Sequence, residues 1–198
     1  MKEVFLNKSL NFISKNNNSY TEDEIEKIKY GLEGLYLTIT KLIIILILAW
    51  ILNIFNEILL VLLFLNIIRY PAFGIHANKS IECLITSIIL ILVLPLIIIK
   101  FKINLITKII ISIICFVSYL LFAPADTLKR PLTNKKKRHW RKIASCVIAV
   151  IYIIIIFTSN KPILVNSIFS ALIIEAIMIN PLMYKIMGMP YNNYKKIV

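Results

Sequence analysis

Long runs of Ile and Leu dominate the pattern of hydrophobic and polar positions along this chain. Most of these runs are shorter than the roughly 20 residues that a straight transmembrane helix needs. Tilt, flanking residues or local thinning of the bilayer must supply the remaining length. The pattern therefore predicts membrane-spanning helices but leaves the number of complete spans open. The six apolar stretches are Leu35–Leu52, Ile54–Ile68, Leu84–Ile99, Ile103–Ala123, Ile143–Phe157 and Ile163–Ile179.

Short polar interruptions join these stretches in pairs. Asn53, Lys100–Asn104 and Asn160–Pro162 leave room only for tight turns, which predicts three helical hairpins. We therefore expect an all-α, polytopic membrane protein of about six hydrophobic helices, folded as one membrane domain over residues 1–198. Two of the shorter stretches also fit re-entrant or interfacial segments.

The N-terminal region has a different pattern. Residues 1–15 place apolar side chains at helical spacing among lysines, which predicts an amphipathic helix that lies on the membrane surface. Polar residues interrupt its apolar positions, so this segment is not expected to be a signal peptide. The next helix is predicted to begin near Thr21, which can cap it while the Glu24 side chain bonds back to Thr21.

Composition supports a membrane protein. Of the 198 residues, 59% are hydrophobic and 17% are charged, whereas soluble globular domains have about 45–50% and about 25%. This composition excludes water-soluble enzyme folds, and the Ile and Leu runs exclude a β-sandwich or a disulfide scaffold. The 3 cysteines cannot all pair with one another, so at least one thiol is expected to be free.

The formal net charge of +13 is unevenly distributed. Residues 1–34 carry 5 basic and 6 acidic side chains, a net charge of −1, and the remaining residues carry 18 basic and 4 acidic side chains, a net charge of +14. Because the basic excess follows the apolar stretches, we expect it to set topology and to attract anionic membrane lipids or an acidic partner, not nucleic acid.

The largest basic cluster lies in a predicted loop over residues 124–142. The positive-inside rule makes this loop cytoplasmic. With three complete hairpins, both termini and a second polar loop over residues 69–83 are expected on the same side of the cell membrane. The eight basic residues of the cluster are Lys129, Arg130, Lys135, Lys136, Lys137, Arg138, Arg141 and Lys142.

The candidate chemistry lies in residues 69–83, which read RYPAFGIHANKSIEC. Gly74 is one of only 4 glycines in the chain, which suggests a backbone position that needs a positive φ or the close approach of another segment. His76 is one of 2 histidines, and Cys83 directly precedes the third apolar stretch. A thiolate and an imidazole that can take its proton are the minimum parts for covalent acyl chemistry.

The spacing sets a condition on this chemistry. Residues seven apart in one continuous helix lie about 10.5 Å apart along its axis, whereas proton transfer needs about 3 Å or one bridging water. The chain must therefore bend between His76 and Cys83. Pro71 and Gly74 allow an irregular loop, with Cys83 in the first turn of the next helix, where the helix dipole favours a thiolate. On spacing alone, chance co-occurrence of the two residues is the stronger explanation.

The motifs resemble those of a known family. The segment Gly74–Ala77, with Arg69 before it and Cys83 after it, is similar to the signature of the accessory gene regulator B (AgrB) family of membrane cysteine endopeptidases in Gram-positive bacteria. A second segment, Ala123–Pro131, resembles the Ala-Pro-Ala loop of the family, with its basic run and proline. The order of a polar N-terminal helix and hairpins also agrees over nearly the whole chain.

The resemblance implies an activity in a bacterial cell membrane. Members of the family cut a quorum-sensing precursor peptide of the AgrD type near its C-terminal side and join the new carboxyl group to an internal side chain, which gives a cyclic thiolactone or lactone. The resemblance implies that Cys83 attacks the scissile carbonyl through a thioester intermediate and that His76 accepts and returns the proton. It also implies a homodimer. We find no metal-binding spacing and expect no cofactor.

Charge suggests how the precursor binds. The precursors of the family resemble an amphipathic leader helix with an acidic C-terminal tail, which makes the basic cluster a fitting electrostatic partner. Lys129 and Arg130 match the basic run of the family and are the best candidates, and we add Gly74 to the substrate-binding loop. Arg69 fits a substrate carboxylate and a lipid headgroup equally well. Topology alone would also explain the whole cluster.

Two acidic residues keep more than one role. Glu175 lies within the last apolar stretch. Placing a carboxylate inside a membrane has a high free-energy cost, so such a residue suggests a function. It could pair with a basic residue or hydrogen-bond to substrate. Asp126 could orient His76 only if the two polar loops meet. Packing or loop roles alone are expected for Cys115, Cys146 and His139.

A non-enzymatic class of protein fits the same helices. A small membrane peptide exporter or an immunity protein would need the basic cluster and the membrane-spanning helices but not a thiol. Replacing Cys83 by alanine would therefore abolish the activity of an enzyme but leave a protein of the non-enzymatic class nearly unchanged. The sequence does not give the precursor, the size of the ring or the export route.

Overall fold

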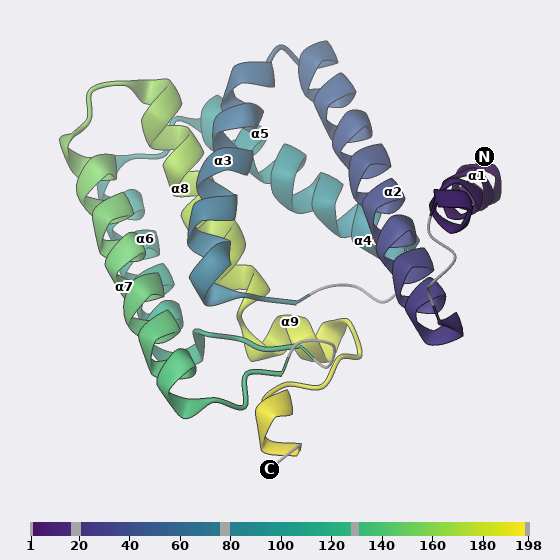
Figure 1. Cartoon of the computed structure of the whole chain (residues 1–198). Helices are drawn as coiled ribbons and strands as arrows, with labels where there is room; N and C mark the ends of the chain where they lie inside the picture. The colour runs from purple at the N-terminus through teal and green to yellow at the C-terminus, as the bar shows by residue number, and fades with distance from the viewer. Residues whose placement is uncertain (1, 17–20, 76–79, 128–130, 197–198) are drawn as a thin grey trace. The chain divides into compact units, whose positions relative to one another are not determined.

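The computed structural model of the chain describes residues 2–16, 21–75, 80–127 and 131–196, and most of them are helical (Figure 1). The chain divides into two compact units, Met1–Leu48 and Ala49–Val198. This confirms the predicted all-α membrane fold. Within the described ranges, five helices are long and apolar enough to cross a membrane: Asp23–Ile51, Phe55–Ala72, Ile81–Phe101, Leu105–Phe122 and Lys135–Thr158.

The first unit contains α1 (Lys2–Asn16) and most of α2 (Glu22–Ile51). The predicted N-terminal helix is therefore present, and Phe12 on its surface is exposed. The α2 helix begins as predicted, because the Thr21 N–H donates to Oε2 of Glu24 at 2.9 Å. This contact satisfies a backbone donor that the helix itself cannot pair.

The helix α8 (Pro162–Met178) forms the core of the second unit (Figure 1). Its residues 167–172 are all buried, as expected for a helix that is apolar on every face. The last predicted stretch is therefore a core helix that other helices surround. Its neighbours are α3 (Phe55–Ala72), α5 (Leu94–Phe101), α6 (Leu105–Phe122) and α7 (Lys135–Thr158).

The third predicted stretch is an interrupted helix. It consists of α4 (Ser80–Ser87), a π-helical segment (Ile88–Val93) and α5. Pro95 lies in the first turn of α5, where it lacks an N–H and crowds the carbonyl one turn back. The helix is wider in the residues that precede Pro95. There the Leu94 N–H donates to the carbonyl of Ile89, five residues back, and this spacing is the π-helical pattern.

The predicted tight turns are present. Asn53 (φ 57°) and Lys102 (φ 41°) are left-handed, and residues 159–161 separate α7 from α8. Asparagine tolerates this conformation well because its short polar side chain can hydrogen-bond locally. A single left-handed residue is enough to reverse the chain direction, so the turns stay short.

The predicted basic loop over residues 124–142 becomes helical before its end. The helix α7 begins at Lys135, and the Asn134 side chain caps it by accepting a hydrogen bond from the Lys137 N–H at 3.2 Å. Asparagine is a favoured N-cap, and Lys and Arg are good helix formers. As a result, 6 of the 8 basic residues of the cluster lie on the first turns of a helix.

Asp126 anchors the C-terminal segment of the chain. Its carboxylate accepts hydrogen bonds from the backbone N–H groups of Tyr194 at 2.8 Å, Asn193 at 3.1 Å and Leu132 at 3.3 Å. The side chain is buried. A buried carboxylate is stable when several donors satisfy it, and here all three donors come from the backbone.

Tyr184 of α9 (Pro181–Ile186) strengthens the same anchor. Its hydroxyl donates to the carbonyl oxygens of Ala125 at 3.1 Å and Asp126 at 3.2 Å. Burial, and then the nearby Asp126 charge, raise the pKa of Tyr184. The hydroxyl therefore keeps its proton and remains a donor.

Replacing Asp126 by alanine is expected to release the C-terminal segment. Hydrogen bonds to charged groups contribute about 1.5–3 kcal/mol each, and we expect a loss of stability of about 3 kcal/mol. Hydrogen–deuterium exchange measured in detergent should become faster at Asn193 and Tyr194. The matched control is Asp23→Ala, which removes the only other aspartate of the chain from an exposed position. Unchanged exchange in Asp126→Ala would show that the carboxylate is not the anchor.

Candidate functional site

The two segments that stand out in the sequence, around Gly74 and around Pro124, are paired. The Gly74 N–H donates to the Ala125 carbonyl at 3.0 Å, and the Ala125 N–H donates to the Ala72 carbonyl at 2.9 Å. Phe73 and Ala125 thereby form a short parallel β-bridge. Two polar segments that are far apart in the chain are thus held together by backbone hydrogen bonds.

The C-terminal end of α8 completes this arrangement. The Ile75 N–H donates to the Met178 carbonyl at 3.1 Å, and the Ile75 side chain is fully buried. We call residues 72–75, together with Ala125 and Met178, the junction. It joins the end of α3, the segment after α6 and the end of α8.

Gly74 is required by the geometry of the junction. Its φ is 109°, a value that residues with a side chain rarely adopt. A Cβ atom at this position would lie 3.2 Å from Oε1 of Glu175 and 3.4 Å from Cβ of Met178. The prediction that this glycine marks both a positive φ and a close approach is confirmed, and its role in the structure is to let the chain pack against α8.

Arg69 connects the junction to a buried carboxylate. Its Nη2 donates to the Ile75 carbonyl at 2.8 Å, and its Nη1 lies 3.9 Å from Oε2 of Glu175. Glu175 is fully buried, and among the described residues neither of its carboxylate oxygens has a hydrogen-bond partner. A buried charge without a partner is very costly, so Arg69 is the group that compensates it. Of the two roles weighed for Glu175, pairing with a base is the one observed.

Arg141 of α7 also holds the junction, a role that the sequence did not reveal. Its Nη1 donates to the Tyr70 carbonyl at 2.8 Å, and its guanidinium carbon lies 4.4 Å from the centroid of the Phe73 ring. This geometry allows a cation–π contact. No feature of the sequence separates Arg141 from the other basic residues of its cluster, because topology alone accounts for all of them.

Cys83 lies in the first turn of α4, as predicted, and is half-buried. All three cysteines of the chain are thiols, with none in a disulfide. The predicted polar loop over residues 69–83 is helical at both ends, because α3 continues to Ala72 and α4 begins at Ser80. Pro71 is accommodated in the last turn of α3.

Three of the predicted site residues, His76, Lys129 and Arg130, lie outside the described residues. Asp126 was a candidate to orient His76 if the two polar loops met. The loops do meet, but backbone N–H groups occupy both carboxylate oxygens of Asp126. Over the described parts of the chain, no three His, Cys, Asp or Glu side chains are grouped to hold a metal ion.

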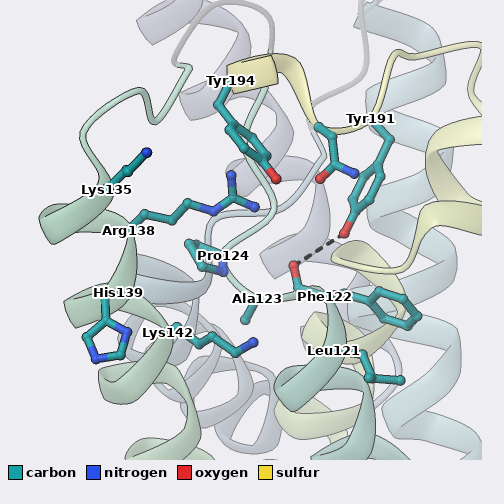
Figure 2. A pocket seen from close by; sticks show the side chains of 11 residues that line it. Leu121, Phe122, Ala123, Pro124, Lys135, Arg138, His139, Lys142, Tyr191 and Tyr194 are labelled. Carbon is teal, nitrogen blue, oxygen red and sulfur yellow. Dashed lines mark hydrogen bonds between the residues drawn. The ribbon is translucent and has the colours of Figure 1, made fainter. Parts of the chain in front are cut away.

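A cavity of about 630 Å³ opens next to the junction, beside the Ala123–Pro124 segment (Figure 2). Basic side chains of α7 line one side of it, and Tyr191 and Tyr194 of the C-terminal segment line another. The Tyr191 hydroxyl lies 3.5 Å from the Phe122 carbonyl, to which it donates. The aromatic residues of the C-terminal segment were not predicted to take part in any site.

Comparisons with known proteins show which sequences this chain resembles. The sequence profile of the family named Accessory gene regulator B matches residues 6–179. Accessory gene regulator protein B of Staphylococcus aureus (strain Newman) is 35% identical over 178 residues, which cover 87% of this chain and 90% of that protein. Its counterpart in Staphylococcus carnosus (strain TM300) is 37% identical over 136 residues, which cover 69% and 71%.

An AgrB-like protein of Listeria innocua is 31% identical over 191 residues, which cover 93% of this chain and 90% of that protein. No solved structure matches the chain. The matched region includes Arg69, Gly74, Ala125 and Glu175, and thus all parts of the junction and its buried ion pair. The chain therefore belongs to the accessory gene regulator B family of quorum-sensing membrane proteins.

Proposed function

We propose that this protein is an integral-membrane cysteine endopeptidase and cyclase that acts on a quorum-sensing precursor peptide of the AgrD type. The junction is the observation that supports this function most directly. Its hydrogen bonds hold Gly74 and Ile75, the two residues directly before His76, against Ala125 and Met178. A general base needs a defined position relative to its nucleophile, and a fixed backbone on one side of His76 contributes to that position.

The chemistry follows from a thiol and an imidazole. His76 accepts the proton of the Cys83 thiol, and the thiolate attacks the carbonyl carbon of the scissile peptide bond. The C–N bond then breaks as His76 gives this proton to the departing amine. The N-terminal part of the precursor remains bound to Cys83 as a thioester.

Cyclisation exchanges one thioester for another. His76, which is neutral again, accepts the proton of an internal thiol of the precursor, and the resulting thiolate attacks the acyl-enzyme carbonyl. The bond between the carbonyl carbon and the Cys83 sulfur breaks, and Cys83 leaves as a thiolate. His76 then returns the proton to Cys83, which restores the starting enzyme. A hydroxyl acceptor would give a lactone by the same displacement. Because thioester exchange has little driving force, water must be kept from the acyl-enzyme, and a site at the membrane boundary favours this.

Charge and topology complete the proposal. The positive-inside rule places the basic cluster in the cytoplasm. With three complete hairpins, both termini and the catalytic loop face the same side. Lys129 and Arg130 bind the acidic tail of the precursor through electrostatic complementarity. Two copies of the chain form the working enzyme.

Arg69 and Glu175 act as positioning residues. Arg69 holds the carbonyl of Ile75, the residue directly before His76, while Glu175 fixes the Arg69 guanidinium from within the core. Neither group reacts in the proposed steps. Their contribution is to keep the backbone that leads into His76 in one conformation.

The acyl-enzyme provides the first test. Incubation of purified protein with a synthetic precursor from the neighbouring reading frame should add the mass of the N-terminal precursor fragment, and hydroxylamine should remove it. Cys83→Ala and His76→Ala should show no adduct. Cys146→Ala, which removes a thiol from an apolar helix, should react like the wild type. The contrary result is a wild-type protein that is folded and reconstituted in lipid but gains no mass, while the precursor stays whole. That result would exclude the protease function, and a peptide exporter or an immunity protein would become the better hypothesis.

Gly74→Ala tests the junction. The positive φ alone costs about 2 kcal/mol for a residue with a side chain, and the new Cβ also meets Oε1 of Glu175. We expect lower thermal stability and acylation slower by roughly 10- to 100-fold. Gly188→Ala is the matched control, because Gly188 has a φ of 61° and nothing within 4 Å of a Cβ. It should lose stability but keep its acylation rate, and equal rates in both variants would remove the junction from the mechanism.

Arg69→Lys tests the positioning role. Lysine keeps the charge but has one ammonium group, which cannot replace the planar guanidinium that reaches both Ile75 and Glu175. We expect the single-turnover acylation rate to fall roughly 10- to 100-fold while KM for the precursor stays the same. If instead KM rises and the acylation rate at saturation is unchanged, Arg69 binds substrate and does not position the loop. Lys100→Gln, in the last turn of α5, serves as the control.

A further inference from the structure

The cavity beside the Ala123–Pro124 segment has an unusual concentration of positive charge. Lys135, Arg138 and Lys142 line it from α7, and their spacings of three and four residues place them on one face of the helix. Figure 2 shows Arg138 and Lys142 reaching from α7 towards the Ala123–Pro124 segment. The described residues that line the cavity include no acidic side chain.

This arrangement is unfavourable unless an anion is present. Like charges three or four residues apart on a helix repel each other, and cations at the start of a helix oppose its dipole. The first turn of α7 contains no acidic residue to offset them. Topology needs positive charge on this side of the membrane, but it does not need three cations on one helix face at the wall of a cavity.

Arg138 is prepared to bind such an anion. Its guanidinium carbon lies 3.2 Å from the centroid of the Tyr194 ring, so the planar group is stacked and fixed in orientation. Its Nη1 is buried and has no hydrogen-bond partner among the described residues. Stacking leaves the N–H donors at the edge of the guanidinium available, and this planar fork matches the oxygens of a phosphate.

The surroundings of the cavity favour a lipid as the source of the anion. The cavity lies where α6 ends and α7 begins, and both helices are long and apolar enough to span a membrane. Leu121, which lines the cavity, is 65% exposed, and Trp140 at the start of α7 is 71% exposed. Exposed tryptophan is typical of the membrane interface, and an exposed apolar wall below a basic pocket can contact acyl chains.

We propose that this pocket binds the headgroup phosphate of an anionic phospholipid, with Arg138 and Lys142 as its main ligands and Lys135 as a further cation. Basic pockets between transmembrane helices are known to bind anionic headgroups. The site is separate from the proposed acyl chemistry, because none of its three cations takes part in the junction. A bound lipid would also join α6, α7 and the C-terminal segment, all of which line the cavity.

Native mass spectrometry of the detergent-purified full chain tests this site without any precursor. The protein is titrated with phosphatidylglycerol and, separately, with phosphatidylcholine that carries the same acyl chains. We expect wild type to bind one phosphatidylglycerol about 25-fold more tightly than phosphatidylcholine, since each of the two main cations contributes about fivefold near an anionic headgroup. Lys142→Gln and Arg138→Gln should each lose about fivefold in affinity for phosphatidylglycerol.

The control removes the same charge elsewhere. Lys100→Gln changes an exposed lysine in the last turn of α5, and Lys102→Gln changes an exposed lysine between α5 and α6. Both variants should keep the affinity of wild type. If Arg138→Gln does not fold because the stack on Tyr194 is lost, Lys142→Gln, which changes an exposed side chain, decides the question alone.

Three results would overturn the proposal. The first is equal affinity of wild type for the two lipids. The second is an affinity for phosphatidylglycerol that Lys142→Gln leaves unchanged. The third is preferential binding of an acidic peptide: if hexaglutamate binds wild type more tightly than phosphatidylglycerol and Lys142→Gln abolishes that binding, the pocket is a peptide site.

Discussion

A backbone that leaves its helix within a membrane protein must pair its N–H and carbonyl groups elsewhere in the chain, because the surrounding lipid cannot. In this protein that requirement is met at the junction. The carbonyls of Ala125 and Met178 accept the N–H groups of Gly74 and Ile75. These few hydrogen bonds determine where α3 ends, how the segment after α6 runs and how the end of α8 lies against both. The proposed site is built on this arrangement.

The buried ion pair connects the junction to the core. Glu175 lies on α8, the helix that the others surround, and its carboxylate can be compensated only by a group that reaches it from outside that helix. Arg69 reaches it from α3 and holds the Ile75 carbonyl at the same time. A buried pair of this kind adds little net stability. Its main effect is on conformation, because it holds the segment before His76 through the Ile75 carbonyl.

The basic cluster illustrates how one feature of the sequence can serve several purposes. Its net charge is sufficient to orient the protein in the membrane. In the structure, however, Arg141 contacts the Tyr70 carbonyl and the Phe73 ring, and Arg138 stacks on Tyr194. The first contact stabilises the junction, and the second shapes the wall of a cavity. Asp126, in turn, keeps the C-terminal segment close enough for that stack to form.

Hydropathy and local backbone preferences were sufficient to predict where the apolar helices lie in the chain, the turn at Asn53, the start of α2 at Thr21 and the special conformation of Gly74. Each of these features depends on residues within one or two turns of each other. The partners of Glu175 and Arg141 could not be predicted in this way, since a hydropathy pattern shows which side chains are buried but not which of them meet. The pairing of Gly74 with Ala125 is of the same kind: it joins positions about fifty residues apart, and only the packing of α3, α6 and α8 brings them within hydrogen-bond distance.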